Sequence, residues 1–121
     1  MNIYCDSNKT RACIVVEGRT CPMIIDYNET VTNNVGEYRA VWFALDLALK
    51  FREQGRTDIV VMTDSQLVVG QVVGIDGKVW KCNHAHLLPL RDSVRDLLKD
   101  TDIKLGWIPR EENLAGLVLG D

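Results

Sequence analysis

The sequence predicts an α/β domain built on a five-stranded mixed sheet, with three antiparallel strands followed by two parallel strands and helices on both faces. The first quarter of the chain holds β-branched and aromatic runs separated by turn residues, which is typical of an antiparallel meander. A long stretch with helical spacing of apolar residues follows it. The next apolar run is continuous, as expected for a central strand that is covered on both faces.

The expected elements occur in the order βββαβααβα. The first three strands are expected at residues 2–6, 12–18 and 21–27, and the turn-forming segments "SNKT" and "GRT" separate them. A helix is expected over residues 34–54, with Gly55 as a suitable stop. The apolar stripe of this helix consists of Val41, Ala44, Leu45, Ala48 and Phe51.

The second half of the chain alternates strands and helices. Pro89 is tolerated only near the first turn of its helix, so that helix is expected to start late or to kink. Trp80 and Trp107 have apolar neighbours and are expected in the core. The expected elements are a strand at 58–64, a helix at 65–73, a loop at 74–78, a helix within 83–100, a strand at 103–109 and a short helix at 111–120.

Composition narrows the possible functions. The chain has 121 residues, 46% of them hydrophobic and 26% charged, which fits one globular domain over residues 1–121 and argues against disorder. No apolar run approaches the roughly 20 residues of a membrane span, and the first residues do not resemble a secretion signal. We therefore expect a cytoplasmic protein, and we expect a monomer. The net charge of −3 argues against strong nonspecific binding to polyanions.

Three acidic residues stand at the ends of expected elements. Glu37 lies on the apolar stripe, where a charge needs a partner, and a capping box with Asn34 is the structural alternative. Asp64 ends the continuous apolar strand, where α/β sheets place ligands, although aspartate is also a favoured helix N-cap. Asp6 ends the first strand, where it could instead be a turn residue.

Taken together, these carboxylates indicate a metal site. Adjacent central strands and the start of the first helix could bring them to one edge of the sheet, where their charges would repel one another. Oxygen ligands with open coordination positions suit Mg²⁺ or Mn²⁺. Two such ions about 3.5–4 Å apart can activate water and stabilise the leaving oxygen in phosphodiester hydrolysis.

The motifs around these residues resemble those of type 1 ribonuclease H. "YCDSN" is similar to the family's first-strand segment, "TNNVGE" to its Thr-Asn-Asn-x-x-Glu segment, and "TDSQLVV" to its Asp-Ser-Gln element. "WIPREENLAG" resembles the segment that joins the last strand to the last helix. The resemblance covers essentially the whole chain. Near "VWKCNHAHLLPLRD" it points to the compact archaeal, phage and bacterial forms, which lack a basic protrusion.

This resemblance implies a ribonuclease H-like fold and a metal-dependent endonuclease that cleaves the RNA strand of RNA/DNA hybrids, leaving 3′-hydroxyl and 5′-phosphate ends. It implies that Asp6, Glu37 and Asp64 are catalytic metal ligands for Mg²⁺ or Mn²⁺, with two ions when substrate is bound. Asn34 and Gln66 would lie against the minor groove of the hybrid, where the 2′-hydroxyl distinguishes RNA from DNA. The other expected substrate contacts are Asn8, Asn33, Lys81 and Arg110.

One position departs from the family pattern. The family has a fourth acidic ligand in the last helix, and this chain has Gly116 there. Three replacements are open: Glu112, which lies four residues earlier on the same helical face and which we favour; Asp121, if the terminus bends back; or water. The departure also leaves a second function open, a catalytically impaired module that binds hybrid or duplex RNA.

Overall fold

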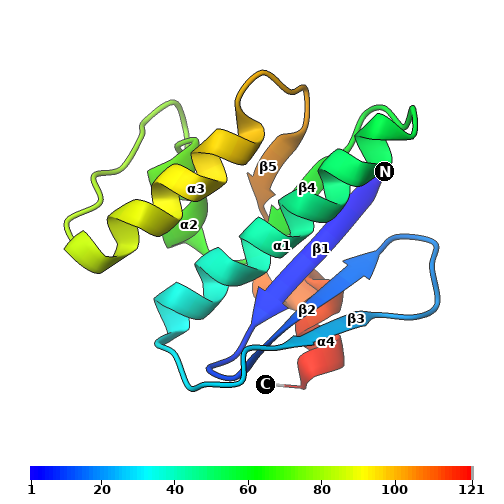
Figure 1. The fold of residues 1–121 in the computed structure, drawn as a ribbon, viewed down its shortest axis with the longest axis horizontal. Coiled ribbons are helices and arrows are strands. Elements are labelled where there is room, and N and C mark those ends of the chain that lie inside the picture. Colours follow the sequence, from blue (N-terminus) through cyan, green and yellow to red (C-terminus); the bar gives the residue numbers. More distant parts are fainter. Residues whose placement is uncertain (121) are drawn as a thin grey trace.

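A computed structural model gives the structure of residues 1–120, and it has the predicted order of strands and α-helices. The five-stranded sheet has the strand order β3-β2-β1-β4-β5, so the first strand is central (Figure 1). The pairs among the first three strands are antiparallel, and β1–β4 and β4–β5 are parallel, as predicted. The strands are β1 (Asn2–Ser7), β2 (Arg11–Val16), β3 (Met23–Asp26), β4 (Val60–Thr63) and β5 (Lys104–Trp107).

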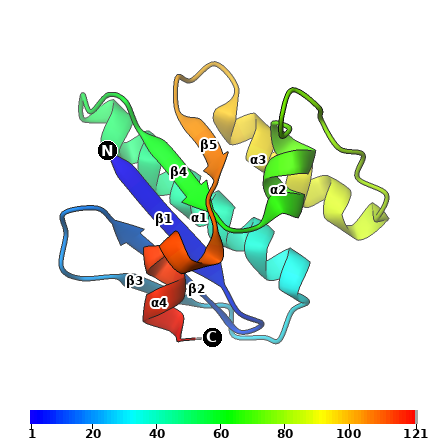
Figure 2. The same cartoon turned by 180° about the vertical axis from the view of Figure 1, so that it is seen from behind.

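Helices cover both faces of this sheet. The long helix α1 (Asn33–Glu53) crosses one face, and α3 (Leu88–Leu98) packs against it on the same side (Figure 1). The short helix α4 (Leu114–Leu119) lies on the opposite face, against β1 and β2 (Figure 2). The remaining helix, α2 (Gln66–Val72), contacts α3 and β5. None of the helices within residues 1–120 has the length and apolar character needed to cross a bilayer.

Helix α1 supplies the main core contact, and all five residues of its predicted stripe are buried. The helix begins after Thr32, whose hydroxyl accepts the Val35 N–H, and ends at Glu53 with Gln54 as its C-cap, followed by Gly55 with φ of +90°. Asn34 is therefore not the cap, and the capping-box alternative for Glu37 is wrong.

The remaining element boundaries differ from the expected ones mainly at their ends. Helix α3 follows a 3₁₀ turn (Ala85–Leu87) and has Pro89 in its first turn, so the expected late start is confirmed. The expected final helix is split into a 3₁₀ turn (Arg110–Glu112) and α4. The split occurs at Asn113, because its side chain accepts the Ala115 N–H and starts a new helix there.

Two tryptophans are more exposed than expected. Trp80 is 36% exposed and Trp107 is 40% exposed, so the prediction that both belong to the core is wrong. Trp80 rests on Gly70, where a Cβ atom would lie 2.3 Å from the indole ring. Trp107 instead donates its Nε1–H to the Asp64 carbonyl oxygen at 3.1 Å. Each tryptophan is thus partly packed against the protein and partly exposed to solvent.

Candidate metal centre

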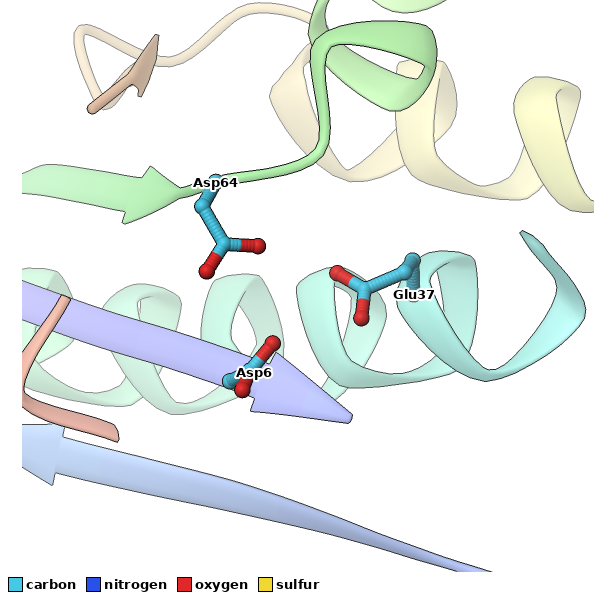
Figure 3. Close-up of side chains that lie close together, drawn as sticks. All are labelled: Asp6, Glu37 and Asp64. Carbon is cyan, nitrogen blue, oxygen red and sulfur yellow. The ribbon is translucent and has the colours of Figure 1, made fainter. Parts of the chain in front are cut away.

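Three carboxylates meet at the carboxyl ends of β1 and β4. Asp6 comes from β1, Asp64 directly follows β4, and Glu37 comes from the beginning of α1 (Figure 3). One oxygen from each side chain lies within 4.8 Å of those from the other two. Parallel central strands end at the same edge of the sheet, and α1 starts beside that edge. The fold therefore brings together the three acidic residues that the sequence singled out.

Asp64 accepts hydrogen bonds through both its backbone and its side chain. Its carbonyl oxygen accepts the Trp107 indole N–H, and its Oδ2 atom accepts an N–H from the Asn113 side chain at 3.3 Å. It is not the N-cap of α2, because Ser65 holds that position and accepts the Val68 N–H. The carboxylate of Asp64 is thus available to the shared pocket.

The Glu37 carboxyl has a strongly raised pKa. Burial, followed by the charges of Asp6 and Asp64, raises the pKa of Glu37 from its ordinary value of 4.5 to about 9. Its Oε2 atom is buried and has no hydrogen-bond partner within residues 1–120. A buried carboxylate oxygen without a partner is costly, so this atom fits a position that a cation completes.

Asp6 is held in a strand rather than in a turn. It pairs with Cys13 in the β1–β2 ladder, and the turn that follows is organised by Asn8, whose side-chain oxygen accepts the N–H groups of Thr10 and Arg11. Burial and then the charge of Asp64 raise the pKa of Asp6, whereas a hydrogen bond from the Ser7 backbone and, less strongly, the positive charge of Arg110 oppose that rise. Two other predicted site residues, Asp64 and Arg110, therefore act electrostatically on Asp6.

The carboxylates line a cavity of about 280 Å³. Asn8, Asn33 and Arg110, three of the predicted substrate contacts, line the same cavity. The other predicted contacts, Asn34, Gln66 and Lys81, are exposed and do not line it. They lie outside the immediate surroundings of the carboxylates, where only an extended ligand would meet them.

The position of the expected fourth acidic ligand does face the site. A Cβ atom on Gly116 would lie 3.1 Å from Asp6 Oδ2. Glu112 is exposed in the 3₁₀ turn and is not among the carboxylates that cluster within residues 1–120, so our preference for it as the replacement is not supported. Asp121 lies outside the described residues.

Asn113 is a site residue that the sequence reasoning missed. It is fully buried, and its Nδ2 atom donates to the Cys5 carbonyl oxygen at 2.9 Å as well as to Asp64. An asparagine ahead of an apolar run is a recognisable helix cap, which the sequence could have indicated. Nothing in the sequence could have indicated its contact with a carboxylate 49 residues away.

The donor set as a whole fits a hard divalent cation. All three side chains offer carboxylate oxygens, and Glu37 contributes an oxygen without a partner in the described part of the chain. Mg²⁺ is commonly bound by one or two carboxylates while it keeps several waters, and Mn²⁺ accepts similar ligands. The residues present can therefore hold such an ion without a fourth carboxylate.

Comparison with known proteins shows which family and which folds this chain is similar to. Residues 5–118 match the family described as reverse transcriptase-like. The bifunctional protein Rv2228c of Mycobacterium tuberculosis is 40% identical over 83 residues, which make up 68% of this chain. The match spans 21% of that relative's length, about a fifth.

Two solved structures are similar over nearly the whole chain. RNase H1 from the halophilic archaeon Halobacterium salinarum NRC-1 has 29% sequence identity and a TM-score of 0.75, covering 98% of this chain and 92% of that one. LC11-RNase H1, isolated from compost and solved in complex with an RNA/DNA hybrid, has 25% identity and a TM-score of 0.69. That match covers 93% of this chain and 88% of the other.

Proposed function

Because the chain belongs to the reverse transcriptase-like family and has the fold of type 1 ribonuclease H, we propose that it is a divalent metal-dependent endonuclease that cleaves the RNA strand of RNA/DNA hybrids. The observation that carries this proposal is the cluster of Asp6, Glu37 and Asp64 at the carboxyl ends of the central strands. Similarity to a structure solved with an RNA/DNA hybrid supports the choice of substrate.

The three carboxylates would hold Mg²⁺ or Mn²⁺, with two ions when substrate is bound. Such ions supply water of lowered pKa and stabilise the charge on the leaving oxygen. Hydrolysis adds water across the P–O3′ bond: the hydroxyl goes to phosphorus, giving a 5′-phosphate, and the hydrogen goes to O3′, giving a 3′-hydroxyl. Asn113 orients Asp64 for this task through its amide N–H.

Substrate recognition would depend mainly on side-chain amides and on few charged side chains. Asn8 and Asn33 line the cavity, so their amides are close enough to bond sugar or phosphate groups near the reacting bond. Asn34 and Gln66 are exposed and would meet base edges and 2′-hydroxyls farther along the minor groove. Arg110 at the cavity and Lys81 beyond it would contact phosphates, so we expect modest affinity that falls steeply with salt.

The absence of a carboxylate at Gly116 favours a second candidate function. The helix that would provide a fourth carboxylate provides no side chain there, although its backbone approaches Asp6. The chain would then bind hybrid or duplex RNA with little or no turnover. This alternative keeps the same substrate surface and differs only in the rate of hydrolysis.

A cleavage assay separates the two functions. End-labelled RNA/DNA hybrid, double-stranded RNA and double-stranded DNA are incubated with the purified protein and Mg²⁺, Mn²⁺ or EDTA. The proposal predicts metal-dependent cleavage of hybrid RNA alone, with 3′-hydroxyl and 5′-phosphate ends. Hybrid binding without cleavage in either metal would favour the binding module, and cleavage of all three duplexes would contradict the proposed specificity.

A further inference from the structure

Tyr27 connects the two segments that carry Asp6 and Glu37. It follows β3 and is nearly buried, with 9% of its surface exposed. Its hydroxyl donates to the Gly36 carbonyl oxygen at 3.0 Å and lies 2.7 Å from the Ser7 hydroxyl. Ser7 directly follows Asp6, and Gly36 directly precedes Glu37. One phenol therefore contacts the chain neighbours of two carboxylates.

The two segments approach each other very closely at this point. A Cβ atom on Gly36 would lie 2.5 Å from Ser7 Oγ and 2.8 Å from the Asn8 carbonyl oxygen. Only glycine allows α1 to begin so near the end of β1. Because the backbones are in contact here, a small shift between them changes the separation of the Asp6 and Glu37 side chains.

Tyr27 is itself held by contacts of its backbone and its ring. Its N–H donates to the Thr10 carbonyl oxygen at 2.9 Å, which ties the β3–α1 connection to the β1–β2 turn that runs beside it (Figure 1). The Arg39 guanidinium lies 5.3 Å from the centre of its ring and is 3.5 Å from the Glu29 carboxylate. These contacts hold the phenol in place without involving the carboxylates.

The hydroxyl keeps its proton at neutral pH. Burial raises the pKa of Tyr27 to about 12, although the Ser7 hydroxyl opposes that rise. With its proton donated to Gly36, the Tyr27 oxygen can accept the proton of Ser7. The Ser7 hydroxyl has the Asn8 carbonyl oxygen as a second acceptor at 2.7 Å. The connection therefore consists of neutral hydrogen bonds that do not titrate with the site.

Glu37 needs such support more than Asp64 does. Asp64 receives a direct hydrogen bond from Asn113 on its carboxylate, whereas Glu37 Oε2 has no partner within residues 1–120. The Glu37 carboxylate interacts with the Asp6 side chain and the Ser7 backbone, so its position depends on how the start of α1 is placed against the end of β1. The start of α1 includes Gly36, whose carbonyl Tyr27 holds.

We infer that Tyr27 is a positioning residue of the metal centre, which fixes the spacing of the Asp6 and Glu37 carboxylates through Ser7 and the Gly36 carbonyl. The inference rests on the proposed function, since Tyr27 would position the carboxylates that hold the proposed metal ions. Tyr27 does not contact the carboxylates in this role; it acts through their chain neighbours.

The test is Tyr27→Phe, which removes one oxygen and leaves the ring and its contact with Arg39. The matched control is Tyr4→Phe, because the Tyr4 hydroxyl also donates a side-chain hydrogen bond, to Glu17 Oε2 at 3.2 Å, and Tyr4 does not line the cavity. Mn²⁺ affinity of each apoprotein is measured by calorimetric titration, and hybrid cleavage is measured over a range of Mn²⁺ concentrations. Tyr27→Phe is expected to weaken Mn²⁺ affinity about threefold to tenfold. Saturating Mn²⁺ should restore most of the cleavage rate.

Hydrogen exchange of the apoproteins provides a second measurement that needs no metal. Amides of residues 33–38 should exchange faster in Tyr27→Phe than in wild type, and at the wild-type rate in Tyr4→Phe. A lowered melting temperature with unchanged Mn²⁺ affinity and unchanged exchange at 33–38 would overturn the inference and leave Tyr27 a residue of general stability.

The same experiment separates this inference from the proposed function. Wild-type protein that neither binds Mn²⁺ nor cleaves hybrid would contradict the nuclease, and the Tyr27 inference about a metal centre would fall with it. Wild-type protein that binds Mn²⁺ and cleaves, with a Tyr27→Phe variant that matches it in affinity and exchange, would contradict the Tyr27 inference alone.

Discussion

Two groups of residues border the candidate metal centre, and these two walls differ in the chemical groups that they offer. The ligand wall consists of Asp6, Glu37 and Asp64, which extend from β1, from the 21-residue helix α1 and from the end of β4. The α4 wall consists of Asn113 and Gly116 at the start of a six-residue helix. The first wall offers three carboxylates, and the second offers an amide N–H and a glycine.

The two walls also differ in how the core supports them. α1 buries a full apolar stripe against the sheet, whereas α4 buries Ala115 and Leu119 and leaves Leu117 66% exposed. Elements with few buried apolar contacts have low local stability and tolerate change better. The difference explains how a ligand could be absent from α4 while the remaining three keep their geometry. The ligand wall should therefore dominate metal binding, and the α4 wall should modulate it.

Asp64→Asn should have the largest effect, because it removes a ligand from the ligand wall and preserves the shape of the side chain. Loss of residues that merely support ligands commonly weakens metal binding about 10–100-fold, so we expect at least about a hundredfold loss of cleavage here. The measurement is hybrid cleavage at fixed Mn²⁺. Asp58→Asn is the control, since Asp58 is exposed and has φ of +54°, which asparagine accepts. Equal activity of wild type and Asp64→Asn would refute the assignment of Asp64.

Glu37→Gln should change how the stability of the apoprotein depends on pH. Glu37 has a pKa of about 9 in the folded protein and an ordinary value of 4.5, so the folded state binds its proton more tightly. That contribution to stability is fully present below the ordinary pKa and is lost as pH rises towards about 9, by an amount on the order of a few kcal/mol.

Glutamine resembles the protonated glutamate, so the variant should lose this pH dependence and also lose metal affinity. Chemical unfolding of the apoproteins between about pH 5 and pH 9 measures the effect. Glu53→Gln, at the exposed end of α1, is the control and should keep the wild-type slope. A wild-type stability that does not fall over this pH range would show that Glu37 is not buried as a neutral acid.

Gly116→Asp should increase the contribution of the α4 wall to metal binding. It adds a carboxylate whose Cβ would lie 3.1 Å from Asp6 Oδ2, so Asp6 must shift slightly to admit it. We expect roughly tenfold higher Mn²⁺ affinity and faster cleavage, with lower stability of the apoprotein because a fourth negative charge joins the cluster. Gly116→Asn has similar size without the charge and should give no gain. A gain of the same size from both variants would indicate a packing effect.

Glu112→Gln should have the smallest effect. Glu112 is exposed, and it acts only weakly on the nearby Tyr4 phenol. Burial raises the pKa of Tyr4 most, Glu17 raises it further, and the charge of Glu112 makes the smallest contribution. We expect less than about a twofold change in cleavage, as for exposed charges in general. The control is Glu111→Gln. A large loss with Glu112→Gln alone would mean that this residue moves to the metal when substrate binds.

The ligand wall could be predicted from sequence far better than the α4 wall. Glu37 interrupts an apolar stripe, and Asp6 and Asp64 end strands, which are local signals that periodicity exposes. Local signals could not decide which residues cap the helices, because Thr32 and Ser65 have neighbours with equal capping ability. The roles of Asn113 and Tyr27 depend on side-chain contacts across distant parts of the chain, and no spacing rule reveals them.

Anomalous diffraction from crystals grown with Mn²⁺ would show whether the three carboxylates bind the ion, because it locates the ion without relying on activity. We predict an anomalous peak between Asp6, Glu37 and Asp64, at about 2.0–2.6 Å from at least two of their carboxylate oxygens. Crystals of Asp64→Asn grown in the same Mn²⁺ concentration should show a much weaker peak. The absence of a peak at the three carboxylates in the wild type, or a peak only at other acidic residues, would contradict this prediction.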